Sequence, residues 1–86
     1  MPNCIQFTKK GEVVPAKLAE VDEAICKHVG VKADPDLWYI SWFNVIGFML
    51  AVGMTWEKVR GDVHGPMLVV TDFLEMNYNV RVWSER

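Results

Sequence analysis

Two cysteines and two histidines are the side chains of this chain best suited to nucleophilic or metal chemistry. Cys26 and His28 lie two positions apart in a stretch with helical periodicity. Such residues point about 200° apart, so the thiol and the imidazole cannot meet as a catalytic pair. Cys4 and His64 are the other cysteine and histidine, and together the four side chains have the right ligand atoms for zinc. Their positions, however, lack the spacing of a zinc site. We therefore expect no metal and no cofactor, and we interpret both cysteines as buried apolar residues.

The carboxylates do not suggest acid–base chemistry either. Glu20, Asp22 and Glu23 fall on the solvated face of a predicted helix, and Asp34 and Asp36 suit the start of the next helix. The sequence has no nucleophile-elbow, phosphate-loop or zinc-protease motif. We therefore expect that the protein is not an enzyme.

The two ends of the chain have the patterns of strands. Residues 4–14 predict a β-hairpin, because weakly alternating residues flank a turn that contains Gly11, and Pro15 ends the return strand. Residues 78–84 alternate apolar and polar side chains, which predicts a final strand. We expect the three strands to form a small antiparallel sheet.

The middle of the chain has helical patterns. Apolar residues at helical spacing predict an amphipathic helix over residues 16–29, which Gly30 ends. Three more helices are predicted over about 35–52, 56–60 and 67–77. The sequence thus predicts an α+β fold, in which an N-terminal β-hairpin and a C-terminal strand form a small antiparallel sheet packed on three to four helices. An 86-residue chain has room for one globular domain, residues 1–86.

The central segment, residues 37–56, carries no charge and approaches the length of a membrane span. However, Ser41 and Asn44 interrupt it, and Gly53 leaves only about 17 helical residues, at the lower limit for spanning. The amphipathic segments around it also need a partner to bury their apolar faces. We expect a core helix rather than a membrane span. Since the start of the chain lacks the features of a signal peptide, we expect a cytoplasmic protein.

Aromatic side chains crowd the start of this central helix. Trp38, Tyr39, Trp42 and Phe43 cover more than half of its circumference, so not all of them can face one core. Three interpretations stay open: a core helix, an exposed interface for a protein partner, and the lining of a small-ligand or nucleotide pocket. We select Trp38, Tyr39 and Trp42 as candidate partner-binding residues, because Trp and Tyr dominate interface hot spots.

Residues 53–60 resemble the turn and the recognition-helix start of helix-turn-helix proteins. The resemblance comprises Gly53, an apolar residue, Thr55 as a cap and an aliphatic residue four positions later. It implies a second helix that enters the DNA major groove. The nine Lys and Arg are scattered, however, and the net charge is −2, so nucleic acid is not the partner we expect.

A second resemblance concerns the whole chain. A Met-Pro-Asn-Cys-Ile start is combined with a central helix that carries Trp38, Tyr39, Trp42, Asn44 and Gly47. This combination resembles small accessory proteins of tailed phages. The resemblance implies a protein that acts by binding a host or phage component, and it assigns no site residues.

The composition, 51% hydrophobic in a chain this short, predicts apolar surface that one small core cannot hide. We therefore expect a non-enzymatic protein-interaction module that binds a protein partner or a second copy of itself. The alternatives are a small-ligand or nucleotide-binding protein that uses the aromatic cluster, and a helix-turn-helix-like DNA-binding regulator.

Overall fold

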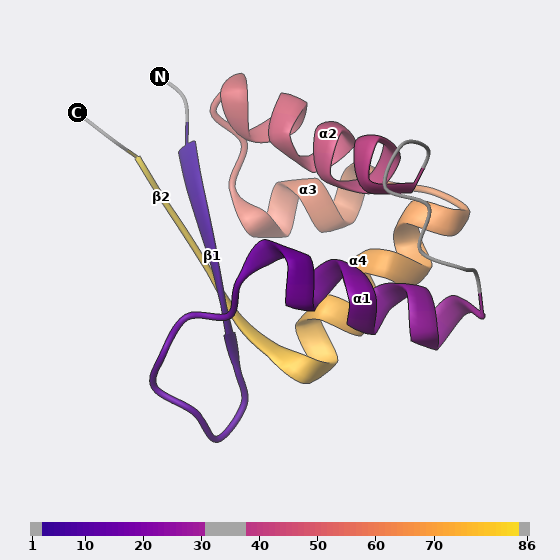
Figure 1. Ribbon diagram of the computed structural model, residues 1–86. Coiled ribbons are helices and arrows are strands. Elements are labelled where there is room, and N and C mark those ends of the chain that lie inside the picture. Colours follow the sequence, from indigo (N-terminus) through magenta and orange to yellow (C-terminus); the bar gives the residue numbers. More distant parts are fainter. Residues whose placement is uncertain (1–2, 31–37, 85–86) are drawn as a thin grey trace.

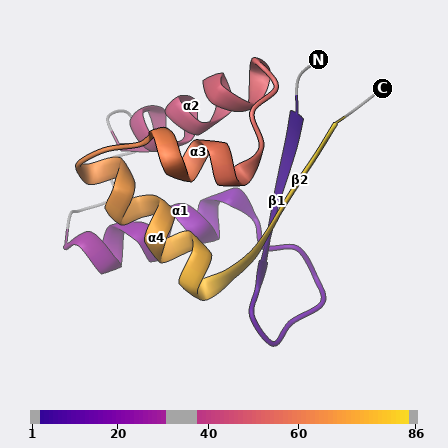
Figure 2. The ribbon, with the colours of Figure 1, turned by 180° about the vertical axis from the view of Figure 1, so that it is seen from behind.

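The computed structural model describes residues 3–30 and 38–84, and it describes the side chains of all of these except residues 38–41. The elements in chain order are β1 (Asn3–Lys9), α1 (Leu18–Val29), α2 (Trp38–Ala51), α3 (Trp56–Asp62), α4 (Pro66–Asn77) and β2 (Tyr78–Ser84). The two strands form a ribbon and the helices all lie on one side of it (Figure 1), as the view from behind in Figure 2 also shows. The predicted α+β class is confirmed.

The sheet pairs the two ends of the described chain. β1 and β2 run antiparallel, with Asn3 opposite Ser84 and Lys9 opposite Tyr78. The predicted third strand is wrong. The described sheet has two strands, and the return segment contributes only one bridge, between Thr8 and Pro15. Pro15 has no N–H to extend a ladder, so the chain leaves β1 at this point and α1 begins shortly after it.

The ends of the helices follow the predicted signals with one exception. Gly30 ends α1 in the left-handed conformation, with φ 75°, and its N–H donates to the Cys26 carbonyl. Thr55 caps α3, since its hydroxyl accepts a hydrogen bond from the Lys58 N–H at 3.3 Å. The exception is Gly61. We expected α3 to end before this glycine, but the helix continues to Asp62. The predicted start of the central helix at residues 34–36 lies outside the described residues.

The core lies between the inner face of the ribbon and the helices. Trp42 of α2 is fully buried there, with its ring centroid 6.5 Å from that of Phe7 on β1. The Phe7 ring is in turn 6.3 Å from that of Tyr78, where β2 begins. The indole N–H of Trp42 donates to an Asp22 carboxylate oxygen at 2.7 Å, which ties α2 to α1. In the described part of the chain, no helix is both long and apolar enough to cross a membrane.

Candidate functional site

The three predicted partner-binding residues have different outcomes. Trp42 is a core residue with no exposed surface, so it is not part of a binding surface in this fold. The reason is its position on α2, which directs the ring between β1 and α1. Trp38 and Tyr39 belong to the first turn of α2, and their side chains lie outside the description. A role for these two residues in partner binding stays a prediction.

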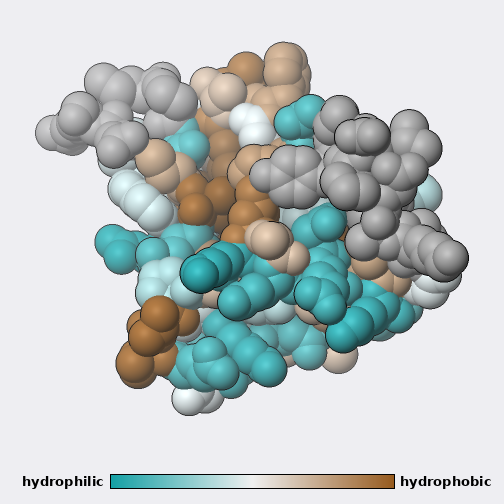
Figure 3. Space-filling view, in the orientation of Figure 1, coloured by the Kyte–Doolittle hydropathy of each residue, from teal (hydrophilic) through white to brown (hydrophobic). Residues whose placement is uncertain are grey.

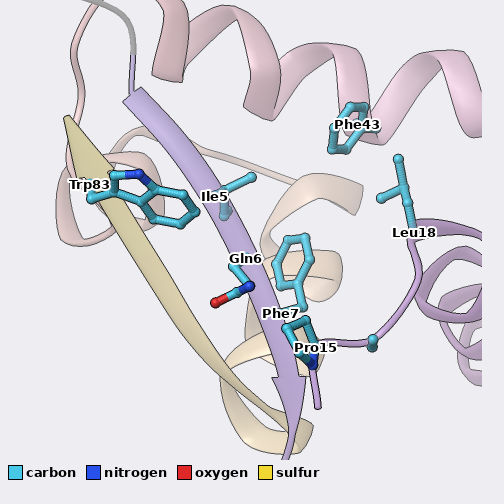
Figure 4. A pocket seen from close by; sticks show the side chains of 8 residues that line it. Ile5, Gln6, Phe7, Pro15, Leu18, Phe43 and Trp83 are labelled. Carbon is cyan, nitrogen blue, oxygen red and sulfur yellow. The ribbon is translucent and has the colours of Figure 1, made fainter. Parts of the chain in front are cut away.

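An apolar groove with a volume of about 340 Å³ opens beside β1, between this strand and the starts of α1 and α2, and Trp83 of β2 also lines it. Figure 4 shows how Leu18 of α1 and Phe43 of α2 point toward the strand from the helical side. The residues that line the groove are Ile5, Gln6, Phe7, Pro15, Ala16, Leu18, Phe43 and Trp83. None of these side chains ionises and only Gln6 is polar, so the groove offers shape and apolar area.

The main chain of β1 turns a row of polar groups toward this groove. The Phe7 carbonyl accepts a hydrogen bond from the Ala16 N–H at 2.8 Å, so it points away from β2. In an antiparallel pair, residues two apart direct their main-chain groups to the same side. The N–H and C=O of Ile5 therefore also point away from β2 and into the groove. Among the described residues, no main-chain group bonds to Ile5 on that side.

Exposed hydrophobic side chains occur at several places. On the face drawn in Figure 3, apolar side chains lie between the strands and α2, and a separate group lies at the tip of the loop that joins β1 to α1. The loop group consists of Val13 and Val14, which are 94% and 68% exposed. Val45 and Phe48 of α2 are exposed as well, and further exposed hydrophobic residues lie on α4. The second half of α2 therefore contributes to the core on one side and to apolar surface on the other.

A second groove, of about 320 Å³, lies beside β2 on the side away from β1. It is bordered by the start of α3 and contains both an acidic and a basic side chain, Glu57 and Arg81. The guanidinium of Arg81 also lies over the Trp83 ring, 5.0 Å from its centroid. This groove is lined by Thr55, Trp56, Glu57, Val80, Arg81 and Val82.

The basic residues of the helix-turn-helix-like segment are engaged within the protein. Lys58 pairs with Asp62 at 3.4 Å, and Arg60 pairs with Asp72 of α4. A recognition helix needs basic side chains that reach phosphates or bases. Arg60 thus ties α3 to α4, whereas the pair of Lys58 with Asp62 is an exposed one within α3, and the DNA-binding alternative stays a prediction.

The titratable side chains of the described region do not converge on a site. Burial raises the pKa of the Cys26 thiol, and the negative charge of Asp22 raises it further. Cys26 is buried whereas His28 is exposed and stacks near Phe73, so the two face different surroundings. Over residues 3–30 and 38–84, no cluster of three or more His, Cys, Asp or Glu could hold a metal ion.

Comparisons with protein-family models, curated proteins and solved structures found no match to this chain. The resemblance to accessory proteins of tailed phages therefore stays a prediction. The same holds for the expectation of a cytoplasmic location.

Sequence reasoning did not find the groove, although it found its surroundings. The lining residues come from β1, the loop after it, α1, α2 and β2, and most of them are apolar residues that the sequence alone does not distinguish from core residues. The one available signal was the hairpin prediction. A return strand that stops at Pro15 leaves the edge of β1 partly unpaired, and the sequence already indicated that stop.

Proposed function

We propose that this protein is a non-enzymatic interaction module that binds a protein partner in the groove beside β1. The observation that carries this proposal is the combination of an apolar groove with the unpaired main-chain edge of Ile5. An apolar pocket supplies affinity through burial, and main-chain groups supply directional hydrogen bonds. Protein segments offer both kinds of complement.

The chemistry of the lining supports a protein partner over the alternatives. A general acid or base must ionise, and none of the eight lining side chains does. A nucleotide needs groups that hold its phosphates, and the lining residues carry no positive charge. DNA binding through α3 is disfavoured because Lys58 and Arg60 are paired with Asp62 and Asp72. An apolar small ligand would fit the volume, and the test below also detects it.

The test places a charge in the groove at a residue that is only partly buried against the core. Leu18 lines the groove and is the first residue of α1. An aspartate is favoured in the first turn of a helix, so Leu18→Asp should keep α1 while it introduces a negative charge. The matched control is Phe48→Asp on the outer face of α2. The Phe48 side chain is 72% exposed and does not line the groove.

The proposal predicts that a protein captured from lysate by the wild type is lost with Leu18→Asp and retained with Phe48→Asp. Thermal unfolding of both variants shows whether each is folded. Loss with Phe48→Asp alone would move the binding site to the outer face of α2. Capture that both variants retain would contradict the proposal. Stabilisation of the wild type by an apolar small molecule, without capture of any protein, would favour the ligand alternative.

A further inference from the structure

We propose that the partner enters the groove as an extended segment that adds to β1 as a third strand, centred on Ile5. This inference rests on the proposed function, because it specifies what the groove beside β1 binds. It concerns one form of partner, an extended peptide segment with uncharged apolar side chains.

The first argument is the hydrogen-bonding capacity of the edge. Ile5 directs one donor and one acceptor into the groove, at hydrogen-bonding positions two residues from the Phe7 carbonyl that Ala16 already uses. A helix satisfies its own main-chain groups and cannot pair with these. An extended segment can pair with both, as in other cases of strand addition to a sheet edge.

The second argument is that the chain itself begins this strand and then leaves it. Pro15 bridges to Thr8 in the antiparallel sense, and the Ala16 N–H bonds to Phe7 at 2.8 Å. Beyond Ala16 the chain turns into α1, so the strand position continues along Ile5 toward Asn3 without a partner from the described residues. At about 3.3 Å per residue, that stretch of β1 has room for roughly three to five residues of an added strand.

The third argument is what already occupies the edge of β1, and it favours a single segment over a second copy of the ribbon. The Ala16 N–H bonds to the Phe7 carbonyl at 2.8 Å, so Pro15 and Ala16 lie directly on this edge. A second copy that paired its own β1 here would bring its own Pro15 and Ala16, which lie on the same edge, against this strand. One extended segment that ends before Ala16, with Leu18 and Phe43 on its helical side (Figure 4), avoids that collision.

The side chains of the groove specify the chemistry of the segment. Successive residues of a strand point to opposite faces. Alternate residues of the added segment would therefore meet Leu18 and Phe43 on the helical side, and the others would meet Gln6 and Trp83. Since no lining residue is charged, a charged residue on the helical side would be desolvated without a partner. The segment that fits has uncharged apolar residues at every second position.

The first experiment selects peptides from a random library of linear dodecamers on the immobilised wild type, followed by binding measurements on variants. We expect enriched peptides to carry uncharged apolar residues with a period of two and to lose at least about tenfold in affinity for Leu18→Asp. Enriched peptides with a helical period that still depend on Leu18 would overturn strand addition and leave the proposed function intact. Failure to enrich any peptide that depends on Leu18 would overturn both.

The second experiment measures amide hydrogen exchange by NMR with one enriched peptide bound. In the unbound protein, the Ile5 N–H should exchange faster than those of Gln6 and Thr8, which face β2. The bound peptide should slow exchange at Ile5 by about tenfold or more and leave Gln6 and Thr8 nearly unchanged. Unchanged exchange at Ile5 in the complex would overturn the proposal.

Removing the donor provides an independent variant. Ile5→Pro lacks the N–H that the added strand would use, and proline is tolerated on an edge strand when its missing N–H faces outward. We expect this variant to bind the peptide at least about tenfold more weakly, since the pairing at Ile5 loses one of its two hydrogen bonds. Equal affinity for a folded Ile5→Pro would contradict strand addition. If this variant does not fold, the exchange measurement decides.

Discussion

β1 and β2 each have one edge that the other strand does not cover, and the two edges are lined differently. The edge of β1 opens onto a groove without any ionisable side chain. The edge of β2 directs the main-chain groups of Val80 and Val82 outward in the same hydrogen-bonding phase, but its groove contains Glu57 and Arg81. Natural sheets often protect their edges with charged side chains. This ribbon has charged side chains in the groove at one edge and none in the groove at the other.

The difference indicates that the exposed edge of β1 is not a general property of a two-stranded ribbon. Both strands have seven residues and pair in one register, so their outer edges present main-chain groups in the same alternation. Only the side chains and the neighbouring elements distinguish them. An edge that is left uncharged beside a groove carries a risk of aggregation, and it is also the kind of edge to which an extended segment can add, as we propose for β1.

The largest effect should come from removing the core contact of β1. Phe7 is 4% exposed and packs against Trp42 and Tyr78, whereas its cross-strand partner Val80 is only half-buried. We expect Phe7→Ala to lower the free energy of unfolding by about 3–5 kcal/mol. We expect Val80→Ala to lower it by about 1 kcal/mol. Urea unfolding measures both, and equal losses would show that the two strands contribute alike.

A smaller effect on stability should follow from removing the cap of α3, the helix whose start borders the β2 groove. The Thr55 hydroxyl holds the first turn of α3 through the Lys58 N–H. Replacing this cap should lower the free energy of unfolding by about 1 kcal/mol in Thr55→Ala, and Thr55→Asp should retain most of it. Peptide affinity at the β1 groove should stay within about twofold in both variants, because distant sites usually act independently. A large loss of affinity in Thr55→Ala would contradict the independence of the two edges.

The charge on the β2 edge should have a weaker effect on stability. Arg81 stacks on Trp83, and removing it in Arg81→Ala should cost about 0.5–1 kcal/mol. The same change removes the basic charge of this edge, so light scattering should detect more self-association than for Arg81→Lys. Unchanged association would contradict a protective role of the Arg81 charge at this edge.

The smallest effect at neutral pH concerns Tyr78, the residue at which β2 begins. Burial raises the pKa of this phenol above its usual value, and the charges of Glu20 and Glu12 add to the rise. Its contribution to stability is therefore complete below about pH 10 and is lost as the pH rises through the raised pKa of the folded state. As the pH rises from about 9 to 11, the free energy of unfolding of Tyr78→Phe should therefore fall less steeply than that of the wild type. Thermal unfolding across that range measures it, and parallel curves would contradict the assignment.

Most of the fold follows from local patterns. The alternation of residues 78–84 predicted β2 with its observed bounds, and helical spacing with Gly30 as the stop predicted α1 closely. Gly61 was less informative, since a glycine inside a helix costs only about 1 kcal/mol and packing of Val59 and Val63 outweighs it. The third strand was wrong because a bridge at Pro15 cannot be extended by a residue that lacks an N–H.

The candidate site depended on information that local patterns do not contain. α2 is apolar on nearly every side, so its sequence could not show that Trp42 faces the core while Phe48 faces outward. The groove forms only when β1 lies beside Leu18 and Phe43, which are distant in sequence. The proposal of binding there rests on main-chain groups of Ile5 that no described residue pairs, and these are recognised only when the neighbours of the strand are placed.

The pairing of Lys9 with Tyr78 also has a consequence for the order of synthesis. β1 leaves the ribosome before β2, and α1 to α4 are made between the two strands. At roughly 5–20 residues per second, several seconds pass between the two events. During that interval both edges of β1 are uncovered, including the one that β2 will occupy. A nascent chain of this protein therefore exposes Ile5 and Phe7, and both edges of their strand, before the sheet can form.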